Sequence, residues 1–149
     1  MPEVSDPQGD LGVLGRRCVA VRRMYHRFHG EAFRTAGPLE LAWSEHGHTT
    51  IDAAADWTLT ISSQAWCDPF AAASDTEREA LAREVGRWEP EAPAAGDPLA
   101  QIIGSDVTAA EPIFNEVGEL SGLQIWFGPV ELVARVVGGE IALEASRSR

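Results

Sequence analysis

The sequence predicts a mainly β domain of the α+β class, with seven to eight short antiparallel strands in two meanders and one amphipathic helix between them. In the first and last thirds of the chain, apolar and polar residues alternate with a period of two, as in strands with one buried face. One segment between these two blocks combines a helix-capping motif with a helical apolar stripe. Such strands form a small barrel, a sandwich or a curved sheet, and the pattern leaves all three open.

One domain accounts for most of the chain. The chain has 149 residues, 44% of them hydrophobic, which is enough for one core and too few for two. Residues 1–15 are rich in Pro, Gly and acids, so we expect a flexible leader there. The single β-rich domain is expected to occupy residues 16–145, and residues 146–149 are expected to fray as a C-terminal tail.

The first β block begins with an apolar, β-forming run at Cys18, which predicts a strand within 16–28. The alternation of Leu39, Leu41 and Trp43 predicts the next strand. A turn around Gly47 should then send the chain back, because glycine tolerates the backbone that tight hairpins need. Two further strands are expected at 49–55 and at 57–62, the latter with Trp57 facing the core. With the strand that contains Leu39, Leu41 and Trp43, they should form a three-stranded meander.

The helix is predicted at 75–88. Ser74 and Glu77 have the spacing of a capping box, and Leu81, Val85 and Trp88 fall on one stripe of a helix.

A linker and a second β block follow the helix. Residues 89–96 contain two prolines and three alanines and are expected to form the linker. Asp97 and Pro98 are the usual cap and first residue of a helix, so they predict a single helical turn, closed by Gly104. The last strands are expected at 107–114, 123–127, 130–136 and 141–145, the final two joined by a tight turn at Gly138 and Gly139.

The charge of the chain restricts its partners. It carries 23 acids against 12 bases, a net charge of -11, which argues against nucleic acid and suits a basic protein partner. All 12 bases are arginines, a composition typical of a GC-rich bacterial genome. The pairs Arg16-Arg17 and Arg22-Arg23 are expected on a solvated strand edge, paired with acids. Two cysteines are too few for a disulfide framework and favour the reducing cytoplasm.

The histidines suggest a metal site. All four, His26, His29, His46 and His48, lie within residues 26–48, and imidazoles two residues apart on a strand share a face. Asp52 is a further candidate ligand for zinc or iron. Against this, His46 and His48 fall on a predicted turn, where exposed histidines are common and need no ligand.

A second set of candidates combines aromatic rings with carboxylates. Such a mixture suits a sugar or a cationic ligand, and paired carboxylates can also do acid and base chemistry. The competing interpretation is structural, because aromatic residues at period two usually belong to the core. The candidates are Trp43, Asp52, Asp56, Trp57, Trp66 and Asp68.

Two functions fit these features. The acidic composition and the lack of a recognisable catalytic motif favour a small non-catalytic binding protein, such as an immunity-type or inhibitor protein that masks a basic surface of its partner. The alternative is a small β-barrel enzyme or carrier that holds an organic ligand in a Trp-lined cavity. We expect no cofactor, no nucleic acid and no membrane partner, and the sequence leaves the oligomeric state and any catalysis open.

Overall fold

The computed structural model describes residues 12–28 and 35–147 of the chain, and its main elements are strands. In chain order they are β1 (Cys18–Arg27), β2 (Thr35–Trp43), β3 (His48–Ala53), β4 (Leu59–Ser62), α1 (Asp75–Glu84), β5 (Arg87–Glu91), the 3-10 helix η1 (Pro98–Ile102), β6 (Ala109–Phe114), β7 (Leu120–Phe127), β8 (Val130–Val137) and β9 (Glu140–Arg147). The predicted class, mainly β with one α-helix between two antiparallel blocks, is confirmed.

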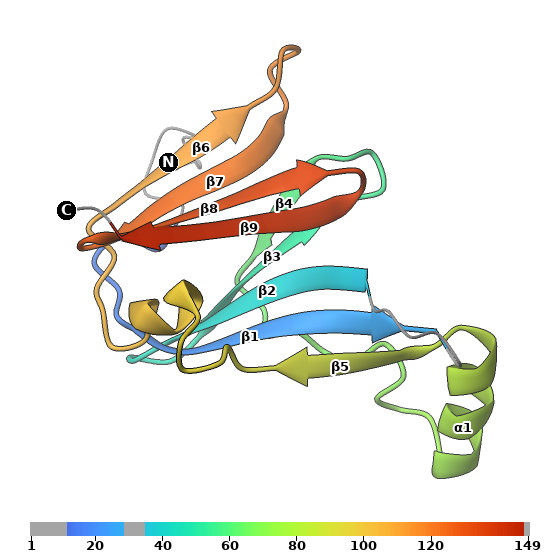
Figure 1. Cartoon of the computed structure of the whole chain (residues 1–149). Helices are drawn as coiled ribbons and strands as arrows, with labels where there is room; N and C mark the ends of the chain where they lie inside the picture. Colours follow the sequence, from blue (N-terminus) through green and yellow to red (C-terminus); the bar gives the residue numbers. More distant parts are fainter. Residues whose placement is uncertain (1–11, 29–34, 148–149) are drawn as a thin grey trace.

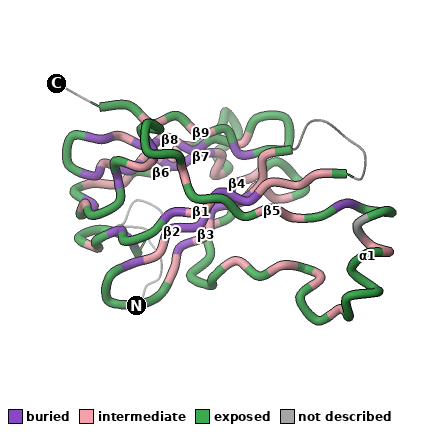
Figure 2. The backbone as a smooth tube through the Cα atoms, turned by 60° about the horizontal axis from the view of Figure 1, so that its bottom comes forward, coloured by how far each residue is buried: buried purple, intermediate pink, exposed green. Residues whose placement is uncertain are grey.

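The strands form two sheets that pack on each other as a sandwich (Figure 1). One has the order β4-β3-β2-β1-β5 and the other the order β6-β7-β8-β9. The core lies between them, where fully buried residues such as Leu39 and Ile51 meet Phe127 and Leu132. Buried positions are concentrated in the strands of both layers, whereas α1 lies at the far end of β5, away from this core (Figure 2). The two sheets remain separate, so of the three arrangements that the sequence leaves open the structure has the sandwich, not the closed barrel or the single curved sheet.

The predicted turns hold where glycine permits a left-handed backbone. Gly138 and Gly139 have φ of 60° and 82°, and they join β8 to β9 in a two-residue hairpin. β2, β3 and β4 form the predicted meander. Asp97 caps η1 through the Leu99 N–H, as expected.

The helix is shorter than predicted, and the expected linker is partly a strand. α1 ends at Glu84, so Trp88 does not continue the helical stripe but lies in β5. Gly86, with φ of 91°, reverses the chain after the helix, and β5 then pairs antiparallel with β1. Pro90 fits there because β5 is an edge strand, whose outer side needs no N–H donor.

Replacing Gly86 with alanine should lower the free energy of unfolding by about 2 to 3 kcal/mol. An added Cβ would take up a φ that L residues rarely adopt and would overlap the carbonyl of Arg27. Gly96→Ala is the matched control, because the space around Gly96 is open. Chemical denaturation of both variants checks this, and equal stability of the two would contradict it.

The predicted strand at 57–62 is wrong at its start, because β4 begins at Leu59 and leaves Trp57 outside it. Trp57 lies in the turn before β4 with φ of 67° and is 62% exposed, so it does not face the core. The turn is fixed by Asp56, which accepts hydrogen bonds from the N–H and hydroxyl of Thr58. A local side-chain hydrogen bond therefore overrides the alternating pattern at this position.

The expectation for Arg22-Arg23 is a second correction, because this pair lies in β1, and β1 lies between β2 and β5 rather than at an edge. Arg16 and Arg17 precede β1. The expected pairing with acids does occur: Arg17 contacts Asp106, and Arg22 makes two hydrogen bonds to Glu40.

The ends of the domain extend beyond the expected bounds. Most of the expected leader lies outside the described residues, but residues 12–15 form a turn that places Val13 in the core. β9 continues to Arg147, and residues 148–149 lie outside the described part. Among the described residues, no helix is long and apolar enough to cross a membrane.

Candidate functional site

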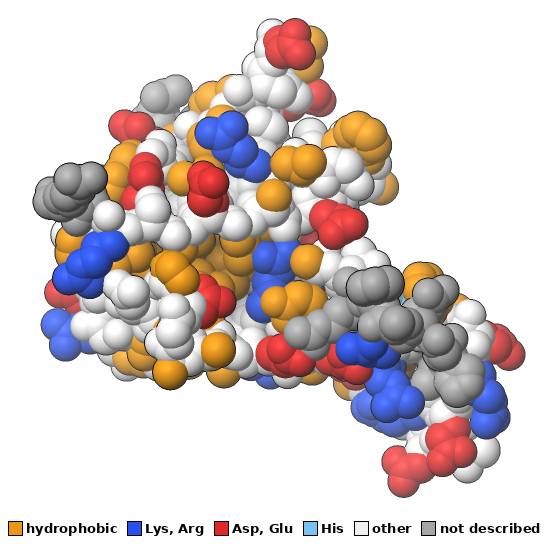
Figure 3. Space-filling model, in the orientation of Figure 1, with side chains coloured by type: hydrophobic (Ala, Val, Ile, Leu, Met, Phe, Trp, Pro, Cys, Tyr) orange, Lys and Arg blue, Asp and Glu red, His pale blue; other side chains and the backbone are white. Residues whose placement is uncertain are grey.

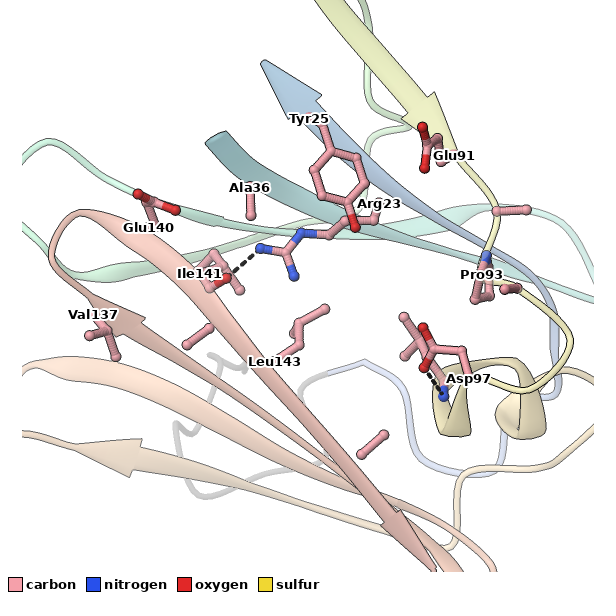
Figure 4. Close-up of a pocket in the computed structure, with 15 residues that line it drawn as sticks. Arg23, Tyr25, Ala36, Glu91, Pro93, Asp97, Val137, Glu140, Ile141 and Leu143 are labelled. Carbon is pink, nitrogen blue, oxygen red and sulfur yellow. Dashed lines mark hydrogen bonds between the residues drawn. The ribbon is translucent and has the colours of Figure 1, made fainter. Parts of the chain in front are cut away.

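A cleft of about 730 Å³ lies between the two sheets. One wall comes from β1 and the end of β5, the other from β9, and residues 92–97 close the side (Figure 4). In the space-filling view the gap between the layers is hollowed, with hydrophobic side chains inside it and acidic ones around it (Figure 3). Its volume lies within the range of ligand sites.

Arg23 is the buried charged group of this cleft. Alternation along β1 places Val21, Arg23 and Tyr25 on the face toward the second sheet. Arg23 is 8% exposed, and its Nη2 donates a hydrogen bond to the carbonyl oxygen of Ile141 in β9. Arg23 therefore ties the two sheets together across the cleft.

The guanidinium of Arg23 is incompletely satisfied. Its buried Nε has no hydrogen-bond partner among the described residues, and its other terminal nitrogen points into the cleft (Figure 4). Burial lowers the pKa of Arg23, whereas Tyr25, Glu140 and Asp52 act in the opposite direction. A buried donor without an acceptor carries an uncompensated desolvation cost.

Carboxylates outnumber bases in the lining. Glu91 lies opposite Arg23 in the β1–β5 ladder, Asp97 caps η1, and Glu140 begins β9. Asp52, on β3, is a predicted site residue that lies close enough to interact with Arg23. Burial raises its pKa, against the lowering effects of the Ala53 N–H and of the Arg23 charge.

The other predicted aromatic and acidic candidates do not gather at this cleft. Trp43 is buried and donates from Nε1 to Thr49 Oγ1 at 2.9 Å, so it belongs to the core. Asp56 holds the β3–β4 turn, and Trp57 packs beside Gly139 at the tip of the β8–β9 hairpin.

Trp66 and Asp68 belong to a separate aromatic cluster near α1. The ring of Trp88 lies 5.8 Å from that of Trp66 and 4.9 Å from that of His26, measured between ring centroids. Asp68 contacts Arg78 of α1 and, with Trp88, lines a smaller cavity of about 260 Å³. The ring contacts join the segment after β4 to β1 and β5, and the Asp68–Arg78 pair joins that segment to α1, which favours the structural interpretation of both residues.

The three histidines of the described residues lie apart from one another as ligands. His26 contacts Phe28 edge-to-face and Trp88 in a tilted arrangement. His46 is exposed in the turn after β2, and His48, in β3, lies opposite Ala42. His29 lies outside the described residues. Within the described part of the chain, no three His, Cys, Asp or Glu side chains come together as a metal site.

The cysteines differ in chemistry. Cys18 is fully buried, and burial raises the pKa of its thiol to about 11, which disfavours the nucleophilic thiolate. Cys67 is exposed, and neither forms a disulfide.

Sequence reasoning missed the cleft because its residues come from three distant segments. One signal was present: Arg23 lies two residues from Val21 and two from Tyr25, so the three share one face of the predicted strand. Such a position marks a charge that needs a partner in the interior.

Comparisons of the chain with protein-family models, with curated proteins and with solved structures gave no match. The function therefore has to be inferred from the cleft and its chemistry.

Proposed function

We propose that this protein is a small non-catalytic binding protein whose inter-sheet cleft receives a basic segment of a partner protein. The observation that carries the proposal is the charge of the cleft, whose lining contains three acidic residues, Glu91, Asp97 and Glu140, and one basic residue, Arg23. Arg23 already donates to Ile141, and Glu140 and Asp52 offset its charge. A cationic side chain entering from solvent therefore meets net negative potential.

The charge of the whole chain supports the same partner. A net charge of -11 attracts basic surfaces over the range of a Debye length and speeds encounter with them. An immunity-type or inhibitor protein, which masks a basic surface of its target, is the form of binding protein that these features favour. Two unpaired cysteines are compatible with the reducing bacterial cytoplasm as its location.

A labelled peptide of alternating arginine and valine is the probe for this function. It should bind in a fluorescence anisotropy titration, and its affinity should fall as salt is raised, whereas a peptide of alternating glutamate and valine should not bind. The double variant Glu91→Gln/Glu140→Gln should weaken binding about three- to tenfold, because two attractive charges are removed from the cleft.

The matched control is Glu111→Gln/Glu116→Gln, which changes the net charge equally. Both residues are exposed, on β6 and in the turn after it, and neither lines the cleft. Equal weakening by the two double variants would show that only overall charge matters, and binding that ignores salt would remove the electrostatic basis of the proposal.

A second candidate, a carrier of a small organic acid, is favoured by one observation. The buried Nε of Arg23 lacks an acceptor, and a carboxylate in the cleft would supply one near it. The cleft contains no tryptophan, so such a site would differ from the Trp-lined cavity that the sequence suggests. Displacement of the labelled peptide by free small carboxylates would favour this second function.

A further inference from the structure

The direction of the backbone groups in β9 follows from its hairpin. In a two-residue hairpin, the residues that flank the turn form a hydrogen-bonded pair, here Val137 and Glu140. Alternation then directs the backbone N–H and C=O of Ala142 and Glu144 toward β8. The backbone groups of Ile141, Leu143 and Ala145 therefore point away from β8, toward the open edge. The hydrogen bond from Arg23 to the Ile141 carbonyl agrees with this register.

β9 differs from the other three edge strands of the described structure. β4 has only four residues, β5 contains Pro90, and β6 contains Pro112 together with an irregular register near its end. Short length, proline and bulges are the usual features that prevent an edge from pairing with another chain. β9 has eight residues, an uninterrupted register with β8 and no proline.

The cleft runs along this unprotected edge. Its lining includes Ile141, Ala142, Leu143 and Ala145 of β9, a stretch of about 14 Å at the rise of an antiparallel strand. Residues 92–97, which close the side of the cleft, are not a strand. No backbone partner is described for the outward groups of Leu143 and Ala145, so this edge of the second sheet is left unpaired along the cleft.

We propose that the basic partner segment binds as an extended strand added to the edge of β9. This inference rests on the proposed function and specifies the conformation and the sequence pattern of the ligand. Main-chain hydrogen bonds to Leu143 and Ala145 supply affinity that is independent of sequence, as in other cases of strand addition. Near Ile141, the terminal nitrogen of Arg23 that does not contact the Ile141 carbonyl donates a hydrogen bond to a carbonyl of the added strand. This contact marks one end of the added strand.

The two faces of β9 define which side chains the ligand carries. Glu140 and Glu144 lie on the solvent face, whereas Leu143 and Ala145 lie on the face toward the core. Each side chain of an added strand lies beside a side chain of β9 that projects from the same face of the sheet. The ligand therefore presents arginine or lysine beside Glu144 and beside Glu140, which also lines the cleft, and apolar side chains beside Leu143 and Ala145, an alternation of basic and apolar residues.

Amide hydrogen exchange measured by NMR tests this inference on the intact chain. In the free protein the amides of Ala142 and Glu144 should exchange slowly and those of Leu143 and Ala145 quickly. Saturation with the arginine–valine peptide should slow exchange at Leu143 and Ala145 at least tenfold and leave Ala142 and Glu144 little changed.

Peptide variants separate strand addition from attraction of charge. Methylation of the backbone nitrogens at alternate residues removes the donors on one edge of the peptide and keeps every charge. We expect one of the two alternate methylation patterns to weaken binding at least tenfold and the other to have a smaller effect, because only one peptide edge meets β9.

The outcomes distinguish this inference from the proposed function. If the peptide binds with the expected salt dependence but both methylation patterns leave its affinity unchanged, strand addition is overturned and the basic-partner function stands. If no basic peptide binds, both the basic-partner function and strand addition are overturned. Light scattering should show a monomer over the concentrations used, whereas a dimer that protects Leu143 and Ala145 without peptide would assign the edge to a second copy of this chain and overturn the inference.

Discussion

Replacing Phe127 with alanine should lower the free energy of unfolding by about 3 to 5 kcal/mol. Phe127 is fully buried at the end of β7, within the core that both sheets share. Its truncation removes apolar surface from the interior and leaves a cavity between the layers, so both the transfer and the packing contributions are lost. Chemical denaturation followed by tryptophan fluorescence measures the change.

Phe114→Ala is the control for the change at Phe127. Phe114 is 39% exposed at the end of β6, so the same truncation there should lower stability by about 1 kcal/mol or less. A loss at Phe127 no larger than that at Phe114 would contradict a single core between the two sheets. A loss near 5 kcal/mol would be a large part of the total stability of a domain of this size.

Replacing Glu40 with glutamine should lower the free energy of unfolding by about 2 kcal/mol at neutral pH. Glu40 is 4% exposed and accepts hydrogen bonds from Arg22 Nε at 2.8 Å, from Arg22 Nη2 at 3.1 Å and from the Trp66 N–H at 2.7 Å. It thereby fixes β2 to β1 and holds the segment that leads to α1. A neutral amide replaces charge-assisted hydrogen bonds with weaker ones and places a second donor against Arg22.

The effect of Glu40 should depend on pH. Burial raises the pKa of Glu40, but the hydrogen bonds from Arg22 and Trp66 act against it, and the pKa lies below the usual value of 4.5. A depressed carboxyl pKa contributes stability above the unfolded-state pKa, and this contribution is lost as pH falls through the folded-state pKa. The stability difference between the native chain and Glu40→Gln should therefore be constant above about pH 5 and shrink below 4.5.

Glu45→Gln is the control for Glu40. The pair between Glu45 and Arg16 is exposed, with a distance of 3.5 Å and a glutamate side chain that is 58% exposed, so its loss should change stability by less than about 1 kcal/mol. If the two variants lose equal stability at neutral pH, the buried pair contributes no more than a solvated one.

The two proposals give the sandwich one binding surface. Arg23 and the carboxylates of the cleft define the charge of the ligand, and the backbone of β9 defines its conformation. Both depend on the same arrangement, in which the sheets separate at one side and leave an edge strand beside the opening. The aromatic cluster of Trp66, Trp88 and His26 lies outside the lining of this cleft.

Local patterns predicted the parts of the fold that depend on near neighbours. The capping box at Ser74, the single turn after Asp97 and the Gly138-Gly139 hairpin all form as expected, since each is stabilised within a few residues. The same patterns fail where a competing local contact is stronger. Asp56 places Trp57 in a turn, and Gly86 ends the helix before Trp88.

The sequence by itself determined a single acidic β-rich domain, because alternation and net charge are properties of the linear chain. Only the tertiary structure decided which strands are edges. β5 pairs with one side of β1 and makes it an interior strand, whereas β9 remains an edge of the second sheet. Arg23, Glu140 and Leu143 come together only because distant strands pair and pack, and such long-range contacts leave no periodic trace in the order of residues.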